Sequence, residues 1–248
     1  MGAKALGKKL LERAGFVIHR VPANRFEAME TTLRQLRTGG YRPRVVIDGG
    51  SNRGQWFGIA SSVFPESEFH LIEPQRECWP TLDAAAARRG RTHVHKTVVT
   101  APGVSSVRMH RGGDGISTGA FVTDDDERFP ADLTAAAATL DGLFAARVQA
   151  DDRAMLKLDI EGHEIEALKG GATLLERVEV ILCEARFFDV YGSGDPTIGT
   201  LIAFLEARGF LLYDFASLSG RKLDARLWLG DPIFIRRGSP LGEDLRLE

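Results

Sequence analysis

The stretch Val45-Val46-Ile47-Asp48-Gly49-Gly50-Ser51-Asn52-Arg53-Gly54-Gln55 decides the fold of this 248-residue chain. Its apolar start has the length of a buried strand, and this strand ends in the carboxylate of Asp48. The glycines permit a tight turn, and a helical pattern follows over 54–64. Such a unit places free backbone N–H groups at the carboxyl edge of a parallel sheet, where open α/β sheets bind their ligands.

Strand and helix patterns alternate along the rest of the chain. We predict strands over 44–48, 69–73, 93–98, 155–159, 178–184, 210–215 and 232–236, and helices over 26–37, 54–64, 77–89, 165–175 and 198–208. Apolar strands separated by helices indicate a mainly parallel sheet that is covered on both faces. The predicted fold class is therefore α/β, with one domain over 41–248 and a helical extension over 1–40.

Residues 100–153 interrupt this alternation. They contain Gly112-Gly113-Asp114-Gly115, an acidic run from Asp124 to Glu127 and an alanine-rich piece before Thr139. Long irregular segments inside compact domains commonly form lids or binding loops. We expect an insertion here, either a lid on the substrate side or a neutral surface excursion.

The composition is that of an ordinary globular protein. Lys plus Arg number 32 against 34 Asp plus Glu, which gives a formal net charge of -2 and argues against a general nucleic-acid-binding protein. Cys78 and Cys183 stand alone, without disulfide-framework or zinc-ligand spacing. We therefore expect a cytoplasmic protein without a nucleic-acid partner.

The first 20 residues are the exception to this charge balance. Leu6, Leu10, Leu11 and Ala14 recur at helical spacing among lysines, which predicts a short basic amphipathic helix. This helix either packs on the main domain or makes weak peripheral contact with an anionic membrane surface. The apolar run over 14–18 is too short for a signal-peptide core or a membrane span, so we expect no transmembrane segment.

An acidic residue follows the glycine turn at a distance typical of ribose recognition. Glu73 ends the second strand about 20 residues beyond the turn, where a carboxylate accepts both ribose hydroxyls of an adenosine ligand. The dinucleotide fingerprint would need glycine at Ser51, and the Gly-Lys-Ser/Thr of a phosphate-binding loop is absent. The pattern Asp48-x-Gly50-x-x-x-Gly54 fits a sulfonium with an amino-acid tail. S-adenosylmethionine is therefore the leading cofactor.

A second group of polar residues lies where the strand over 155–159 ends. Asp159, Glu161 and His163 follow this strand, at the edge where reacting groups of an open sheet gather. His163 is a candidate general base because an imidazole titrates near pH 6.5, and Asp159 or Glu161 are the alternatives. Glu164 and Glu166 are explained as acids at a helix N-terminus.

Oxygen ligands suggest a metal alternative at the same edge. Asp159, Glu161 and Glu184 could together hold a magnesium ion, which would acidify a bound hydroxyl. His93 and His95 point to one face of a strand and are interpreted as ordinary half-buried residues rather than ligands.

These motifs together resemble the FkbM family of S-adenosylmethionine-dependent methyltransferases, from about Val45 to Ile235. The resemblance rests on 48–55, Ile72-Glu73-Pro74, Thr139-Leu140-Asp141, Lys157-Leu158-Asp159-Ile160-Glu161-Gly162, Leu168-Lys169-Gly170 and Glu184. It implies a Rossmann-like class I methyltransferase fold, a seven-stranded sheet whose last strand runs antiparallel. The predicted cofactor-binding residues are Asp48, Gly49, Gly50, Asn52, Gly54, Glu73 and Pro74, and the substrate-side residues are Asp159, Glu161 and His163.

The resemblance also implies O-methylation of a hydroxyl on a sugar, glycan or natural-product acceptor. Two other functions share parts of the pattern. A nicotinamide-dependent oxidoreductase would share the sheet and Glu73, although Ser51 breaks its glycine spacing. A non-catalytic module would bind S-adenosylmethionine without turnover. A nucleic-acid base methyltransferase is disfavoured because Asp159-Ile160-Glu161-Gly162 stands where an Asn/Asp-Pro-Pro-aromatic run is expected.

Overall fold

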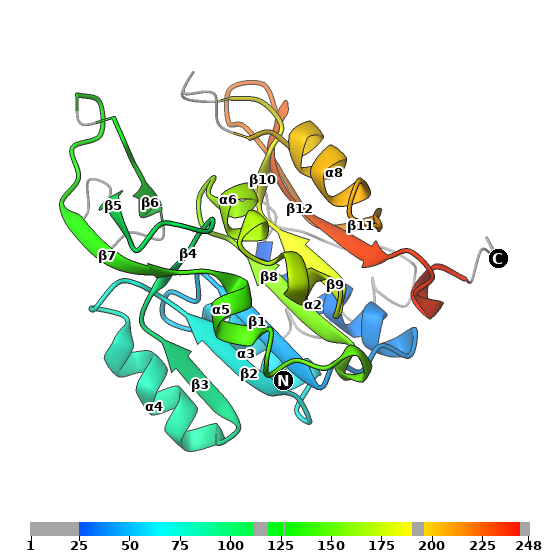
Figure 1. The fold of residues 1–248 in the computed structure, drawn as a ribbon. Helices are drawn as coiled ribbons and strands as arrows, with labels where there is room; N and C mark the ends of the chain where they lie inside the picture. The colour runs from blue at the N-terminus through cyan, green and yellow to red at the C-terminus, as the bar shows by residue number, and fades with distance from the viewer. Residues whose placement is uncertain (1–24, 112–118, 126, 190–195, 244–248) are drawn as a thin grey trace, which may run out of the picture.

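A twisted central sheet forms the body of the computed structural model, which describes residues 25–111, 119–125, 127–189 and 196–243. The strands follow the order β3-β2-β1-β8-β9-β12-β11, with β10 continuing beyond β9 along β12 (Figure 1). Their bounds are β1 Val45–Gly49, β2 Glu68–Ile72, β3 Thr92–His95, β8 Ala154–Leu158, β9 Val178–Cys183, β10 Ala185–Arg186, β11 Phe210–Gly220 and β12 Leu227–Arg236.

The pairing of the strands confirms the predicted sheet. β3, β2, β1, β8 and β9 run parallel to one another. β12, the last strand of the chain, is antiparallel to both β9 and β11. Because β9 and β10 occupy one position in succession, the eight hydrogen-bonded strands fill the seven positions expected of a class I methyltransferase sheet.

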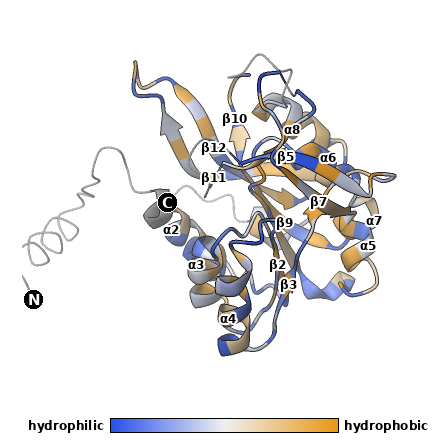
Figure 2. Ribbon diagram, turned by 90° about the vertical axis from the view of Figure 1, so that its left-hand side faces the viewer, coloured by the Kyte–Doolittle hydropathy of each residue, from blue (hydrophilic) through white to orange (hydrophobic). Residues whose placement is uncertain are grey.

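Helices cover both faces of this sheet, as the alternation predicts. Figure 2 shows α2 (Arg25–Thr38), α3 (Gln55–Val63) and α4 (Trp79–Arg89) on one side. The helices α5 (Leu140–Phe144), α6 (Glu164–Lys169), α7 (Ala172–Leu175) and α8 (Ile198–Glu206) contribute to the core on the other side. Successive strand residues point to opposite faces, so Val46 packs with α2–α4 while Ile47 packs with α5–α8.

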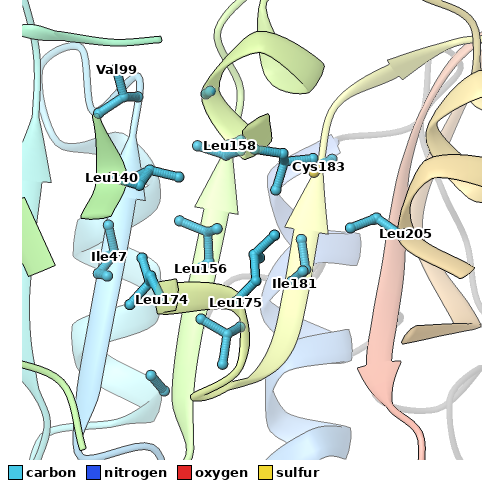
Figure 3. Packing of buried hydrophobic residues seen from close by; sticks show 14 of the residues in the cluster. Ile47, Val99, Leu140, Leu156, Leu158, Leu174, Leu175, Ile181, Cys183 and Leu205 are labelled. Atoms are coloured by element: carbon cyan, nitrogen blue, oxygen red, sulfur yellow. The ribbon is translucent and has the colours of Figure 1, made fainter. Parts of the chain in front are cut away.

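The core between the sheet and α5–α8 explains why these strands are continuously apolar. Ile47, Leu156 and Ile181 project from three neighbouring strands toward Leu174 and Leu175 (Figure 3). Each of these side chains is at most 3% exposed. Burying one Leu or Ile contributes about 1.5–3 kcal/mol, so the two-sided burial of β1, β8 and β9 holds the site-bearing edge in place.

The expectation of an irregular insertion over 100–153 is wrong in part, because this region carries its own small sheet. The strands β4 (Val98–Val99), β5 (Ser106–His110), β6 (Phe121–Val122) and β7 (Leu133–Ala138) pair in the order β4-β7-β5-β6. The predicted strand over 93–98 therefore splits, with β3 in the main sheet and β4 in the small one. The glycine run Gly112-Gly113-Asp114-Gly115 lies outside the described residues.

Three further boundaries differ from the predictions. The helix over 165–175 is two helices, because the Gly170-Gly171 pair ends α6, and a Cβ on Gly170 would lie 2.1 Å from the Thr100 carbonyl oxygen. The strand over 210–215 extends to Gly220, and the strand over 232–236 begins at Leu227. The basic helix predicted within residues 1–20 lies outside the described residues. In the part of the chain that is described, no helix is long and apolar enough to cross a membrane.

The turn after β1 fits only because it contains a glycine at position 50. Gly50 has a φ of 76°, and a Cβ there would lie 2.0 Å from the carbonyl oxygen of Asp159. That distance is far inside van der Waals contact, and the contacting atom is backbone. The ends of β1 and β8 are therefore too close together for any residue other than glycine at position 50.

We predict that Gly50→Ala lowers the free energy of unfolding by at least about 3 kcal/mol, because it combines backbone strain with a backbone clash. The matched control is Gly40→Ala, since Gly40 has a φ of 90° but no atom within 4 Å of its Cβ position. This control should cost only about 1–2 kcal/mol. Urea denaturation of both variants measures the difference, and equal losses would contradict the close approach.

Candidate functional site

The polar residues singled out in the sequence meet at one edge of the main sheet. Glu73 follows β2, Asp159 and Glu161 follow β8, and Glu184 follows β9. These strands are parallel neighbours around β1, so their carboxyl ends converge.

A buried ion pair joins β1 and β8 beneath this edge. The Lys157 Nζ lies 3.0 Å from Asp48 Oδ1 and also donates to the carbonyl oxygens of Gly49 at 3.2 Å and Gly50 at 3.0 Å. Asp48 is fully buried and Lys157 is 2% exposed. Burial raises the pKa of Asp48. Although burial opposes it, the carboxylates of Asp48 and Asp159 raise the pKa of Lys157.

The turn between β1 and α3 is held against the end of β2 by hydrogen bonds. The backbone N–H groups of Gly50 and Ser51 both donate to the Ile72 carbonyl oxygen at 3.1 Å. The Ser51 hydroxyl donates to the Asp48 carbonyl oxygen and accepts from the Ile72 N–H. Ser51, which excludes the dinucleotide fingerprint, thus also locks this turn. Gly54, the N-cap residue of α3, has a φ of 84° in the left-handed region.

Glu73 presents a buried, oriented carboxylate beside this turn. Its Oε2 accepts from the Asn52 N–H at 2.7 Å, and its Oε1 accepts from the Gln75 N–H at 2.9 Å. Trp79 Nε1 donates to the Glu73 carbonyl oxygen at 2.9 Å. Burial raises the pKa of this carboxyl, while the two N–H groups act in the opposite direction. The Gln75 side chain donates to this carboxylate as well. A carboxylate offers about four lone-pair sites, so Glu73 can still accept a hydroxyl donor.

The segment after β8 has a strained backbone that Glu164 holds in place. Glu161 has a φ of 58°, which is uncommon for a residue other than glycine. The Glu164 carboxylate accepts from the N–H groups of Ile160 at 3.0 Å and Gly162 at 3.3 Å. Burial raises the pKa of Glu164 to about 7. Glu164 therefore fixes the backbone of the segment between β8 and α6 by these two hydrogen bonds. Its interpretation as an acid that only stabilises the helix N-terminus does not include this role.

His163 lies at the start of α6 and faces Thr100. Its Nε2 lies 2.9 Å from the Thr100 hydroxyl oxygen, which is itself buried. Burial lowers the pKa of His163, and the carboxylates of Glu166 and Asp124 oppose that change. The imidazole is therefore neutral at pH 7 and can accept a proton.

The three carboxylates predicted as a metal site do come together. One oxygen each from Asp159, Glu161 and Glu184 lies within 4.8 Å of the other two. Cations also contact this group, because Lys157 Nζ is 3.7 Å from Asp159 and Arg186 Nη2 is 3.5 Å from Glu161. The arrangement suits a hard divalent cation or a set of carboxylates balanced by Lys157 and Arg186.

Three cavities meet at Glu161. One of about 540 Å³ runs along Glu73, Pro74 and the β4 residues toward His163. The second, of about 760 Å³, lies on the Lys157 and Trp56 side of the turn. The third, of about 1330 Å³, opens beyond His163 toward β6. Glu161 lines all three, and His163 lines the first and third.

The predicted cofactor residues divide into two groups. Gly50, Asn52, Glu73 and Pro74 line the first cavity. Asp48, Gly49 and Gly54 line none of these three cavities. They belong instead to the end of β1 and to the turn between β1 and α3.

Several residues of the site were not predicted from the sequence. Lys157 is one of them, although a lone lysine in an otherwise apolar strand is a signal of a buried ion pair. Met109, Ala120 and Val122 wall the first cavity from the small sheet. Trp56 lines the second cavity, and its buried Nε1 has no hydrogen-bond partner among the described residues.

The side chains of His93 and His95 contact β2 and line none of these three cavities, although His95 ends β3 and its carbonyl oxygen accepts from the Glu73 N–H at 3.0 Å. His95 Nε2 is 3.0 Å from His70 Nδ1, and His93 Nε2 is 3.2 Å from Glu68 Oε1. His93 is half exposed. These imidazoles therefore pair with neighbouring side chains of β2.

Comparison with known proteins identifies the family. The family model for the methyltransferase FkbM domain matches residues 48–212. Similar solved structures include a precorrin-6y C5,15-methyltransferase from Geobacter metallireducens, 13% identical, with a TM-score of 0.43 over 85% of this chain and 88% of that one. Another is a 1,6-didemethyltoxoflavin-N1-methyltransferase from Burkholderia thailandensis with bound S-adenosylhomocysteine, 15% identical, with a TM-score of 0.45 over 85% and 78%. None of the curated proteins matches this sequence. Because the family match spans most of the chain, the protein belongs to the FkbM family of S-adenosylmethionine-dependent methyltransferases.

Proposed function

We propose that the protein transfers the methyl group of S-adenosylmethionine to a hydroxyl oxygen of a sugar, glycan or natural-product acceptor. The observation that carries this proposal is the position of His163. Its imidazole lines both the cavity that contains Glu73 and the larger cavity beyond it. A neutral base at such a junction suits an acceptor whose hydroxyl must lose its proton.

The residues around the first two cavities fit the cofactor. The Glu73 carboxylate is fixed by two N–H groups and offers its remaining lone pairs to ribose hydroxyls. The second cavity offers an amino-acid carboxylate the Trp56 Nε1–H, which has no hydrogen-bond partner among the described residues. We assign cofactor contact to Gly50, Asn52, Glu73 and Pro74, and the shaping of the turn to Asp48, Gly49 and Gly54. S-adenosylmethionine, when bound, supplies an electrophilic methyl group.

His163 then acts as the general base. A neutral imidazole whose Nε2–H donates to the Thr100 hydroxyl keeps Nδ1 free to accept the acceptor's proton. Thr100 thereby fixes the ring orientation. Glu161 and Asp159 lie at the same junction and are the alternative bases. Proximity and orientation of the two reactants supply the rest of the rate enhancement.

The reaction itself is tested with S-adenosylmethionine carrying a ¹³C-labelled methyl group. Neutral sugars, amino sugars, nucleotide sugars, glycolipids and macrolide-type polyols serve as acceptors. Two-dimensional NMR of the product distinguishes a methyl on oxygen from one on nitrogen or carbon. A labelled N-methyl or C-methyl product would overturn the O-methylation proposal, and cofactor binding without turnover of any acceptor would favour the non-catalytic module.

We predict that Glu73→Gln weakens S-adenosylhomocysteine binding about 10- to 100-fold, because it removes a charged acceptor from a ribose. Isothermal titration calorimetry measures this affinity. Glu68→Gln is the matched control, since Glu68 begins the same strand at its other end and is 38% exposed. Unchanged affinity in Glu73→Gln would remove Glu73 from the cofactor site.

We predict that His163→Ala lowers kcat about 10²- to 10⁴-fold while the affinity for S-adenosylhomocysteine changes less than about twofold. Because burial lowers the pKa of His163, wild-type kcat should fall on the acidic side, where the imidazole gains a proton, and the midpoint of this fall should lie below that of an ordinary histidine. The variant should lose this acidic limb. A wild-type kcat in His163→Ala would shift the role of base to Asp159 or Glu161.

A magnesium-dependent version of the same reaction is the second candidate. The grouping of Asp159, Glu161 and Glu184 supports it, and these residues would then hold the ion that acidifies the hydroxyl. Exhaustive dialysis against EDTA separates the two versions. Full activity after dialysis would mean that His163 deprotonates the hydroxyl without a metal ion. A loss of activity that added Mg²⁺ restores would mean that an ion held by the three carboxylates acidifies the hydroxyl.

A further inference from the structure

The cavity beyond His163 has a distinctive lining. This acceptor cavity, of about 1330 Å³, lies between β6, the segment that follows it and the start of α6. Its volume exceeds that of the cavity beside Glu73, and it reaches that cavity through Val122, Glu161 and His163. A molecule bound in the acceptor cavity would therefore present its reacting group next to His163.

The charge of this lining is predominantly negative. Asp124 and Asp125 come from the segment that follows β6, whereas Glu161 follows β8 and Glu166 belongs to α6. Arg186 is the one cationic side chain among the residues that line the described part of the cavity, and its Nη2 already faces Glu161 at 3.5 Å.

Two of these carboxylates line the cavity together with His163. Glu166 and Asp124 both act electrostatically on the His163 imidazole, although they come from different elements. Glu166 also meets Lys169 at 2.6 Å, but both side chains are more than 40% exposed. Such a solvent-exposed pair is screened and offsets little of the field that a bound molecule would experience.

Aromatic rings form another part of the wall. Phe121 and Phe129 line the cavity and pack edge to face with ring centroids 5.1 Å apart. His110 supports both rings, at 5.5 Å and 5.9 Å. Aromatic faces provide apolar surface for the C–H faces of a ring-shaped acceptor, while carboxylates accept its hydroxyl or ammonium donors.

We propose that this cavity is the acceptor site and that it selects hydroxylated acceptors without an anionic group, favouring those that carry a protonated amine. The inference rests on the proposed function, because it concerns the substrate of that same site. Asp124 and Glu166 attract a protonated amine and repel a phosphate or carboxylate that approaches His163. Phosphorylated sugars, nucleotide sugars and uronic acids are then poor acceptors.

Three matched probes test this selectivity without requiring turnover. Methyl glucoside is the neutral reference, methyl glucosaminide replaces its C2 hydroxyl with an ammonium group, and methyl glucuronide replaces its C6 hydroxymethyl with a carboxylate. Saturation-transfer NMR titrations against the protein loaded with S-adenosylhomocysteine measure their affinities at low ionic strength. We expect methyl glucosaminide to bind at least about tenfold more tightly than methyl glucuronide, with methyl glucoside between them.

A charge-removing variant links the effect to the cavity. In Asp124→Asn/Glu166→Gln, the ratio of the two extreme affinities should fall at least about threefold. The control Asp151→Asn/Glu206→Gln changes the net charge equally at two exposed carboxylates that line none of the three cavities, and it should keep the wild-type ratio.

Several results would overturn the proposal. These are methyl glucuronide binding as tightly as methyl glucosaminide, saturation transfer to none of the probes, or an equal effect of both double variants. The outcome is independent of the methyl-transfer assay. Charge-selective binding without methyl transfer to any hydroxyl would contradict the proposed reaction but support the proposed selectivity of the cavity. O-methylation that prefers anionic acceptors would support the proposed reaction but contradict the selectivity.

Discussion

The ion pair between Lys157 and Asp48 is the constraint on which the site depends. A lysine buried between two strands needs every one of its donors satisfied, and Nζ meets one carboxylate and two backbone carbonyls of the β1 turn. This pairing requires the ends of β1 and β8 to be close together. The close approach in turn leaves no room for a Cβ at Gly50. Removing one partner of a buried ion pair typically costs 3–5 kcal/mol, so the pair is also a stability determinant.

The other polar groups of the site are positioned relative to this ion pair. The turn directs the Asn52 N–H to Glu73 on the β2 side, and the end of β8 directs Asp159 and Glu161 to the other side. Glu164 holds the strained segment around Glu161, and Thr100 orients His163 from across the sheet edge. The three cavities therefore share one junction, which is the geometry that a transfer between two bound reactants requires.

The apolar periodicity predicted the main sheet and the helices on both of its faces, because two-sided burial leaves a strong local signal. Glu73 and Glu161 could likewise be predicted, since both follow buried strands. The small sheet was missed because the alanine-rich strand β7 lacks the β-branched pattern typical of strands. The contact between His163 and Thr100 joins residues 63 positions apart, and only the folded chain brings them together. The Lys157 pair depends on strand register in the same way.

The proposed reaction requires the sulfonium end of the cofactor to lie at the junction lined by Glu161 and His163. A crystal structure of the protein with S-adenosylhomocysteine tests it most directly. We expect both ribose hydroxyls within hydrogen-bonding distance of the Glu73 carboxylate, and the sulfur facing Glu161 with an open path to His163. Ribose hydroxyls away from Glu73, or a sulfur atom separated from His163 by protein, would contradict this placement of the cofactor.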